Sequence, residues 1–257
     1  RPKPFCRCWH QSAETSSLVG MAAWALWRSR DLWWVRALAR LGGRWSFRAP
    51  LRTARLLYGF ACTEAQSELE LRDAARACPD ERRQALYLRH ALDEARHARA
   101  FAEHAQALSR VAGGAAFSRP SAGSEGLFER LGELRFLAFV HAAERRGRVE
   151  FEIYAKLARE RGALGLAQLF EELIRDERQH EAYSARLLDE LGGETEGPRA
   201  LAFARRWQAW RAFRRIGRAV SGALYGVTML ALYALLAPFA LLWRLKPNRR
   251  HGFSSEP

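Results

Sequence analysis

The sequence contains two copies of the motif Glu-x-x-His, and they constrain its fold more than any other feature. The copies are Glu94–His97 and Glu177–His180. On an α-helix, residues three positions apart lie on one face, so each motif directs a carboxylate and an imidazole toward the same point. A lone glutamate precedes each motif, Glu64 by 30 residues and Glu144 by 33. The pattern therefore predicts four helices that supply ligands to one site.

Hydrophobic periodicity places these ligands on buried helix faces. Around each motif, apolar residues recur at alternating steps of three and four, which is the spacing of one helix face. A charged glutamate on a buried face is costly unless it is paired or bound to a metal. Four glutamates and two histidines from four helices match a dinuclear iron or manganese centre. The predicted metal ligands are Glu64, Glu94, His97, Glu144, Glu177 and His180.

Four further polar residues lie within about one helical turn of these predicted ligands. Asp93 and Asp176 directly precede the two motif glutamates, and His90 and His141 lie close to two of the predicted glutamates. Such groups often orient metal ligands by hydrogen bonding. Solvated aspartates and hydrogen-bonded core histidines are the alternative interpretation, and the sequence leaves both open.

Proline and glycine mark the expected ends of the helices. Pro50 can begin the first helix, and a Pro-Asp pair ending at Asp80 separates it from the second, with Asp80 as the N-terminal cap. Gly162 stands where the third helix must turn into the fourth, and Gly193 closes the bundle. Residues 109–133 form a link much longer than a tight turn. It predicts two antiparallel helix pairs joined by one crossover.

The residues around the second motif carry a family resemblance. The similar segments are 143–144, 150–158, 169–173 and 176–180. They resemble the rubrerythrin type of the ferritin-like di-iron carboxylate superfamily, and the resemblance extends over residues 51–193. It implies an all-α fold, a ferritin-like four-helix bundle at 50–193 with one long crossover. An N-terminal interfacial helix and a C-terminal transmembrane helix are expected in addition.

The resemblance also implies roles for the six predicted ligands. Glu94 and Glu177 would bridge two irons, and the terminal ligands would be Glu64, Glu144, His97 and His180. Manganese is the alternative metal, because it accepts the same ligands. Two departures stand out: Gly147 occupies the position of a further ligand glutamate in rubrerythrins, and the paired Cys-x-x-Cys of a rubredoxin domain is missing. A resident electron-transfer iron is therefore not expected.

The net charge of +14 resides in the flanks of the predicted bundle. Residues 51–200 carry 23 basic and 25 acidic side chains, whereas the remainder carries 19 basic and 3 acidic ones. Nucleic acid is not an expected partner, because the bundle that carries the site has no basic excess. The basic flanks suit anionic lipid head groups instead.

Residues 219–243 form an uncharged, apolar stretch of 25 positions, long enough to cross a hydrocarbon core of about 30 Å. We expect a transmembrane anchor here, after a basic linker at 194–218 and before a basic tail at 244–257. Pro238 leaves a shallow hairpin as the competing interpretation. Arginine is more frequent before the stretch than after it, which favours a bacterial inner membrane with the bundle on the cytoplasmic side.

Residues 1–48 form an extension rich in tryptophan and arginine. From Met21 onward its composition is typical of a helix that lies in the lipid head-group region. The alternative is a helix packed against the bundle. Met21 is also a candidate start of the native chain, in which case Cys6 and Cys8 would not exist. The four cysteines show no zinc or iron–sulfur spacing, so a reducing compartment is expected.

Three functions fit these features. The first is a membrane-anchored di-iron oxidoreductase that reacts with O2, peroxide or Fe(II), as the resemblance implies. The second is a di-iron hydroxylase or desaturase of a lipid-soluble substrate such as a quinone, as in the similar demethoxyubiquinone hydroxylase family; membrane attachment favours it. The third is a non-enzymatic membrane iron-handling or adaptor protein. Candidate partners are membrane lipids through the basic flanks, an external electron donor and a second copy of the chain.

Overall fold

The structure is a computed structural model that describes residues 32–120 and 123–245. The described residues form helices and connecting loops without any strand, which confirms the predicted all-α fold. The chain divides into two compact units, one that ends at Ala204 and one that begins at Arg205. The candidate start at Met21 and the first part of the predicted interfacial helix lie outside the described residues.

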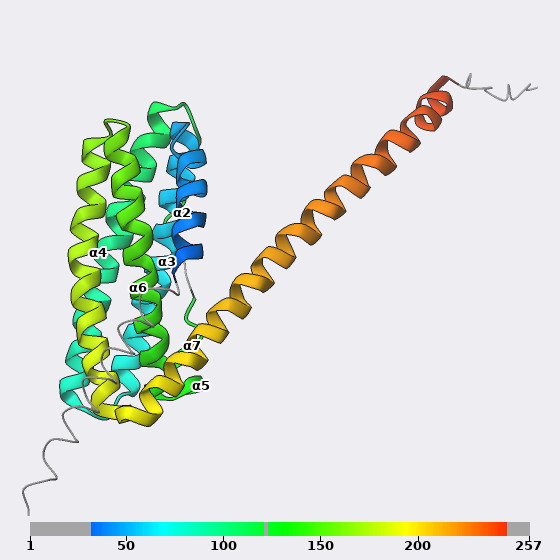
Figure 1. Cartoon of the computed structure of the whole chain (residues 1–257). Coiled ribbons are helices and arrows are strands. Elements are labelled where there is room, and N and C mark those ends of the chain that lie inside the picture. Colours follow the sequence, from blue (N-terminus) through cyan, green and yellow to red (C-terminus); the bar gives the residue numbers. More distant parts are fainter. Residues whose placement is uncertain (1–31, 121–122, 246–257) are drawn as a thin grey trace, which may run out of the picture. The chain divides into compact units, whose positions relative to one another are not determined.

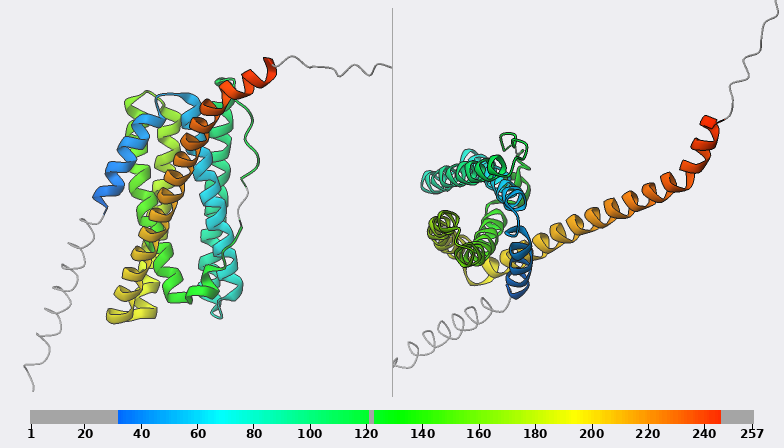
Figure 2. Two further views of the ribbon diagram at one scale, coloured as in Figure 1. Left: turned by 90° about the vertical axis from the view of Figure 1, so that its right-hand side faces the viewer. Right: turned by 90° about the horizontal axis from the view of Figure 1, so that it is seen from above.

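Four long helices make up the first unit, and Figures 1 and 2 show them side by side. They are α3 (Pro50–Ala77), α4 (Glu81–Val111), α6 (Glu133–Glu160) and the first part of α7 (Leu164–Leu245). The predicted four-helix bundle is thereby confirmed. A fifth helix, α2 (Trp33–Ser46), precedes the bundle, and a short helix, α5 (Leu127–Leu131), lies within the crossover.

The helix ends are those that local sequence signals predict. Pro50 occupies the first turn of α3, where its missing N–H has no helical partner to lose. The Asp80 side chain accepts a hydrogen bond of 2.8 Å from the backbone N–H of Arg83 and so caps α4. Gly162 adopts a φ of +71° at the turn from α6 to α7, a conformation that glycine reaches without strain.

The crossover from α4 to α6 runs between the two ends of the bundle (Figure 1) and is fixed to α3 by Glu70. This buried carboxylate accepts hydrogen bonds from the backbone N–H groups of Glu125 and Leu127, the second at 2.9 Å. Farther back along the crossover, the Phe117 ring stacks on Tyr58 of α3 with centroids 4.5 Å apart. The long link therefore follows a defined path.

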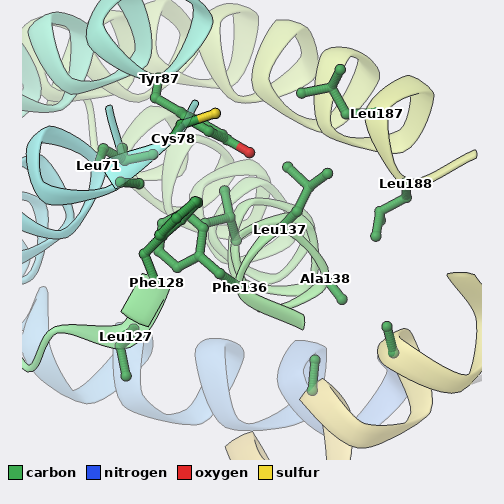
Figure 3. Packing of buried hydrophobic residues seen from close by; sticks show 14 of the residues in the cluster. Leu71, Cys78, Tyr87, Leu127, Phe128, Phe136, Leu137, Ala138, Leu187 and Leu188 are labelled. Carbon is green, nitrogen blue, oxygen red and sulfur yellow. The ribbon is translucent and has the colours of Figure 1, made fainter. Parts of the chain in front are cut away.

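Two separate apolar clusters fill the bundle, one toward each end. The first contains Tyr87, Phe136 and Leu187 and is drawn in Figure 3. The second contains Leu57, Phe101, Phe151 and Phe170 among others. On each of the four helices, the predicted ligands stand between the residues of the first cluster and those of the second. The sequence pattern thus places the polar residues in one layer at mid-length of an otherwise apolar core.

A glycine kink lets the chain continue past the bundle. Gly193 has a φ of +54° and a ψ of −159°, which interrupts α7, and Gly192 approaches the backbone of Gly197. Beyond the kink, Ala200 and Ala204 join the first apolar cluster. The stretch 194–218, expected as a linker, is helical and contributes its beginning to the bundle unit, because small side chains there can pack closely on the helices.

We expect Gly192→Ala to destabilise the bundle by about 1–3 kcal/mol, because of overpacking. An added Cβ would lie 2.5 Å from the backbone nitrogen of Gly197, which cannot move aside without shifting the kink. Gly165→Ala is the matched control on the same helix, since its Cβ would meet nothing within 4 Å. Urea denaturation of the detergent-solubilised chain, followed by circular dichroism, measures both variants. Equal stability of the two would contradict the close approach.

Helix α2 packs one face against α6 and leaves another face exposed. The Cβ of a residue at 43 would lie 2.6 Å from Leu157 of α6, so only Gly43 permits this approach. The described part of the N-terminal extension therefore packs on the bundle, as the alternative interpretation had it. The buried stripe is Val35, Ala39, Gly43 and Ser46. The opposite, exposed apolar stripe is Trp34, Leu38, Leu41 and Trp45.

The second unit contains the remainder of α7, which is described up to Leu245. Its segment Val220–Pro238 is the single stretch of the described residues that is long and apolar enough to cross a membrane. None of that window is buried within the protein. Exposed side chains such as Leu224, Leu230 and Tyr233 make this segment unlike a core helix.

Candidate metal centre

All six predicted ligands are buried at mid-length of the bundle. None is more than 8% exposed. They come from all four helices, namely α3 (Glu64), α4 (Glu94, His97), α6 (Glu144) and α7 (Glu177, His180). Burial of so many ionisable groups in one layer is costly unless they are paired or bind a cation. The layer is therefore the place where a metal ion would offset that cost.

The ligand atoms form two groups that share Glu94. In one group, the atoms of Glu94, Glu144, His180 and an additional residue, His90, lie within 4.8 Å of one another. In the other, those of Glu94, His97 and Glu177 do so. Both groups consist of buried residues that can hold a metal ion. Of the two glutamates predicted to bridge, Glu94 belongs to both groups and Glu177 to one, and both roles stay predictions.

Glu64 stands beside the two groups rather than within either. Its side chain shares a hydrogen bond with Glu94. Glu177, likewise, shares a hydrogen bond with Glu144. The structure therefore brings all six predicted ligands together, five in the two groups and Glu64 in contact with the shared carboxylate.

Two aspartates orient the two motif histidines, and they do so across the bundle. His97 Nε2 lies 3.1 Å from Asp176, and His180 Nε2 lies 3.2 Å from Asp93. Each aspartate thus contacts the histidine of the other motif. Arg96 contacts both aspartates: its Nη1 lies 2.8 Å from Asp93, and its Nη2 lies 2.8 Å from Asp176. The role of orienting group, rather than that of a solvated aspartate, fits these contacts.

Hydrogen bonding from the histidines lowers the pKa of both aspartates. His180 and then Arg96 hold the pKa of Asp93 at about 2, and His97 with Arg96 lowers that of Asp176. Both carboxylates therefore remain ionised and accept from Nε2–H. That leaves the Nδ1 atoms of His97 and His180 buried without a hydrogen-bond partner. Two orphaned nitrogens that face carboxylates are suited to bind a metal.

We expect Asp93→Ala and Asp176→Ala each to weaken metal binding about 10- to 100-fold, because the histidine facing each one would lose its orientation. Titration of the metal-free chain with Co2+, followed by its optical bands, measures the affinity. Asp189→Ala, on the same helix as Asp176, is the control and should bind as the wild type does. Unchanged affinity in both aspartate variants would show that the histidines are oriented by packing alone.

The four glutamates divide into two kinds by their pKa. Burial, together with neighbouring carboxylates, raises the pKa of Glu64 and Glu177 well above the ordinary value. Burial opposes ionisation of Glu94 and Glu144 as well, but interactions with neighbouring side chains outweigh it and lower their pKa. At Glu94 the main opposing contributions are hydrogen bonds from Glu64 and His90, and at Glu144 the largest is the charge of His90. Before a metal binds, the layer thus holds protons that metal binding must release.

Residues 135–211 match the family model named Rubrerythrin. This region is identified as a ferritin-like domain of the rubrerythrin type, and the helical bundle is consistent with it. No significant match was found among curated proteins or among solved structures. The matched region covers α6 and the first part of α7, and so it includes Glu144, Glu177 and His180.

This rubrerythrin-type domain differs from the family pattern at Gly147. The glycine faces the centre, since its Cβ would lie 3.8 Å from a carboxylate oxygen of Glu177. A further ligand glutamate, which the family resemblance would lead one to expect here, is replaced by a residue without a side chain. The centre therefore has one carboxylate ligand fewer on the side of Glu177 than the family resemblance implies.

His90 is the residue of the ligand layer that sequence reasoning did not assign. It stands one helical turn before Glu94, but His141 stands equally close to Glu144, and the sequence cannot separate them. The structure does: His90 belongs to a ligand group, whereas His141 Nδ1 lies 3.0 Å from the hydroxyl of Ser184 and belongs to neither group.

Proposed function

We propose that this chain is a membrane-attached di-iron oxidoreductase of the rubrerythrin type, which reacts with O2, peroxide or Fe(II). The observation that carries the proposal is the pair of buried ligand groups that share Glu94 within a rubrerythrin-type bundle. When bound, two irons together supply two electrons to O2 or peroxide, and carboxylate ligands favour the ferric product. Manganese, with the same ligand preferences, is the competing metal.

The residues of the chain have distinct parts in this function. Glu94 would hold both metals, Glu144 and His180 would complete one group, and Glu177 and His97 would complete the other, with Glu64 in contact with Glu94. Asp93 and Asp176 fix the imidazole rings. The apolar clusters on either side exclude water from the layer. Electrons for repeated turnover come from an external donor in this proposal.

Anaerobic loading of the detergent-solubilised full chain with Fe(II) tests the proposal. We expect about two irons per chain and an optical change on addition of stoichiometric peroxide or O2, as Fe(II) is oxidised to Fe(III). A reductant added afterwards should restore the reduced spectrum. Binding of a single iron per chain, or two irons that neither oxidant changes, would overturn the proposal.

Membrane attachment is supported by two apolar surfaces. One is the exposed segment Val220–Pro238, and the other is the exposed apolar stripe of α2. The double variant Leu230→Arg and Tyr233→Arg should lose resistance to alkaline extraction from membranes, since each arginine costs about 2.5–3.5 kcal/mol at the centre of a span. The matched variant with alanine at both positions should stay in the membrane fraction after alkaline extraction. Extraction of the wild-type chain at alkaline pH would contradict a spanning anchor.

A second candidate function is hydroxylation or desaturation of a lipid-soluble substrate such as a quinone. The observation that favours it is the position of α2, which packs on α6, the helix of Glu144, while exposing an apolar stripe. Consumption of O2 coupled to a modified quinone or acyl chain would support this candidate over the first. Iron uptake with neither oxidant nor substrate turnover would instead favour an iron-handling protein.

A further inference from the structure

We propose that His90 is a seventh metal ligand, which binds through Nε2 at the end of the centre that contains Glu144 and His180. The inference rests on the proposed dinuclear centre and adds a third imidazole to it. It would make the two metal positions chemically different, with two histidines at one and one histidine at the other.

The position of His90 is that of a ligand rather than of a peripheral core residue. It is 1% exposed, and its Nε2 lies 3.1 Å from Glu94 Oε1 and 3.5 Å from Glu144 Oε1. The inward nitrogen of His180 lies 3.6 Å and 3.5 Å from the same two carboxylates. The two imidazole nitrogens thus share Glu94 Oε1 and contact different oxygens of the Glu144 carboxylate, Oε1 for His90 and Oε2 for His180.

The distances from these two nitrogens to the two carboxylates suit a single cation. A metal bound at about 2.1 Å to each ligand separates neighbouring ligand atoms by about 3.0–3.4 Å. The four nitrogen–oxygen separations, between 3.1 and 3.6 Å, fall close to that range. The imidazole rings of His90 and His180 lie against each other with centroids 3.7 Å apart, so both nitrogens approach from one direction.

The outer nitrogen of His90 is held as a ligating histidine requires. Its Nδ1 lies 2.7 Å from the hydroxyl of Tyr183, a buried residue of α7. His97 and His180 show the same arrangement, with their outer nitrogens on Asp176 and Asp93. A partner on the outer nitrogen fixes the ring and selects the tautomer whose other nitrogen is free to bind metal. All three histidines therefore have a partner on the outer nitrogen, and the inward Nε2 of His90, which contacts Glu94 Oε1 at 3.1 Å, would exchange that contact for the metal.

Charge balance also favours a neutral seventh ligand. Four glutamates already balance the charge of two divalent cations, and a further carboxylate would add a buried net charge. This chain has Gly147 in place of the additional glutamate on the side of Glu177 and has His90 on the side of Glu144. A neutral imidazole completes coordination there without changing the net charge.

The test counts ligating histidines in the Co2+-loaded full chain by proton magnetic resonance. Each imidazole bound to the paramagnetic ion shows its outer N–H proton as a strongly shifted, exchangeable signal. We expect such signals from three histidines in the wild type and from two in His90→Gln. The matched control, His141→Gln, replaces another buried histidine, on α6, and should retain all three.

A second variant keeps the test valid if His90→Gln fails to fold. Tyr183→Phe removes only the hydroxyl beside His90 Nδ1, so it should shift or exchange one signal faster and leave the other two unchanged. Two signals in the Co2+-loaded wild type would overturn the inference while leaving the dinuclear centre intact. A chain that takes up no Co2+ would instead reject the proposed function on which the inference rests.

Discussion

Replacing Glu94 by alanine is expected to abolish binding of both metal ions. Its carboxylate is the one side chain that belongs to both ligand groups, and it lies 3.1 Å from His90, 3.6 Å from His180 and 3.8 Å from His97. A cation in either group would lose a negatively charged ligand and the link to its neighbour. Metal analysis after equilibration with Fe(II) or Mn(II) should then fall from about two ions per chain to none.

The matched comparison is Glu144→Ala, which removes a buried glutamate from one ligand group only. We expect this variant to keep the ion held with His97 and Glu177 and to bind about one ion per chain. Circular dichroism should show that both variants are folded. Equal loss in the two variants would mean that both metals depend on each other, whereas two ions retained in Glu94→Ala would exclude the shared ligand.

Replacing Phe101 by alanine is expected to cost about 3–5 kcal/mol of unfolding free energy, because a fully buried aromatic ring leaves a cavity that its neighbours cannot fill. Phe101 is 0% exposed. Its ring lies 5.2 Å from Phe60, 5.6 Å from Phe151 and 5.9 Å from Phe170, measured between centroids. These partners belong to the three other helices of the bundle, so the ring connects all four.

Urea denaturation of the metal-free chain in detergent measures this cost without a contribution from bound metal. Leu92→Ala is the control on the same helix: Leu92 is 59% exposed, and its loss should change stability by about 0.5 kcal/mol or less. A Phe101→Ala variant as stable as Leu92→Ala would show that the second apolar cluster does not hold the helices together.

The sequence predicts the bundle well because its signals are local. The ring of Pro50 and the side chain of Asp80 act on the first turn of their own helices, and Gly162 acts on its own φ. The alternation of apolar residues within each helix also fixes which face is buried, and so it places Glu94 and Glu177 in the core. The roles of the individual ligands stay predictions until a metal is observed.

Features that depend on contacts between distant residues could not be predicted. His90 and His141 stand in similar positions in the sequence. What distinguishes them is the partner that each contacts on another helix, Tyr183 for His90 and Ser184 for His141. The packing of α2 on α6 depends in the same way on the space beside Gly43. Nothing in the composition of 194–218 indicates that its beginning would join the core.

The exchange of aspartates between the two motifs has a consequence for how the protein matures. The contacts from Asp93 to His180 and from Asp176 to His97 join residues 87 and 79 positions apart, so neither hairpin can assemble an oriented imidazole alone. Contacts between residues this distant in the sequence form late, after the helix pair α3 and α4 and the helix pair α6 and α7 have each formed locally. We therefore expect a newly made chain to bind metal at this site only after the two helix pairs have packed together.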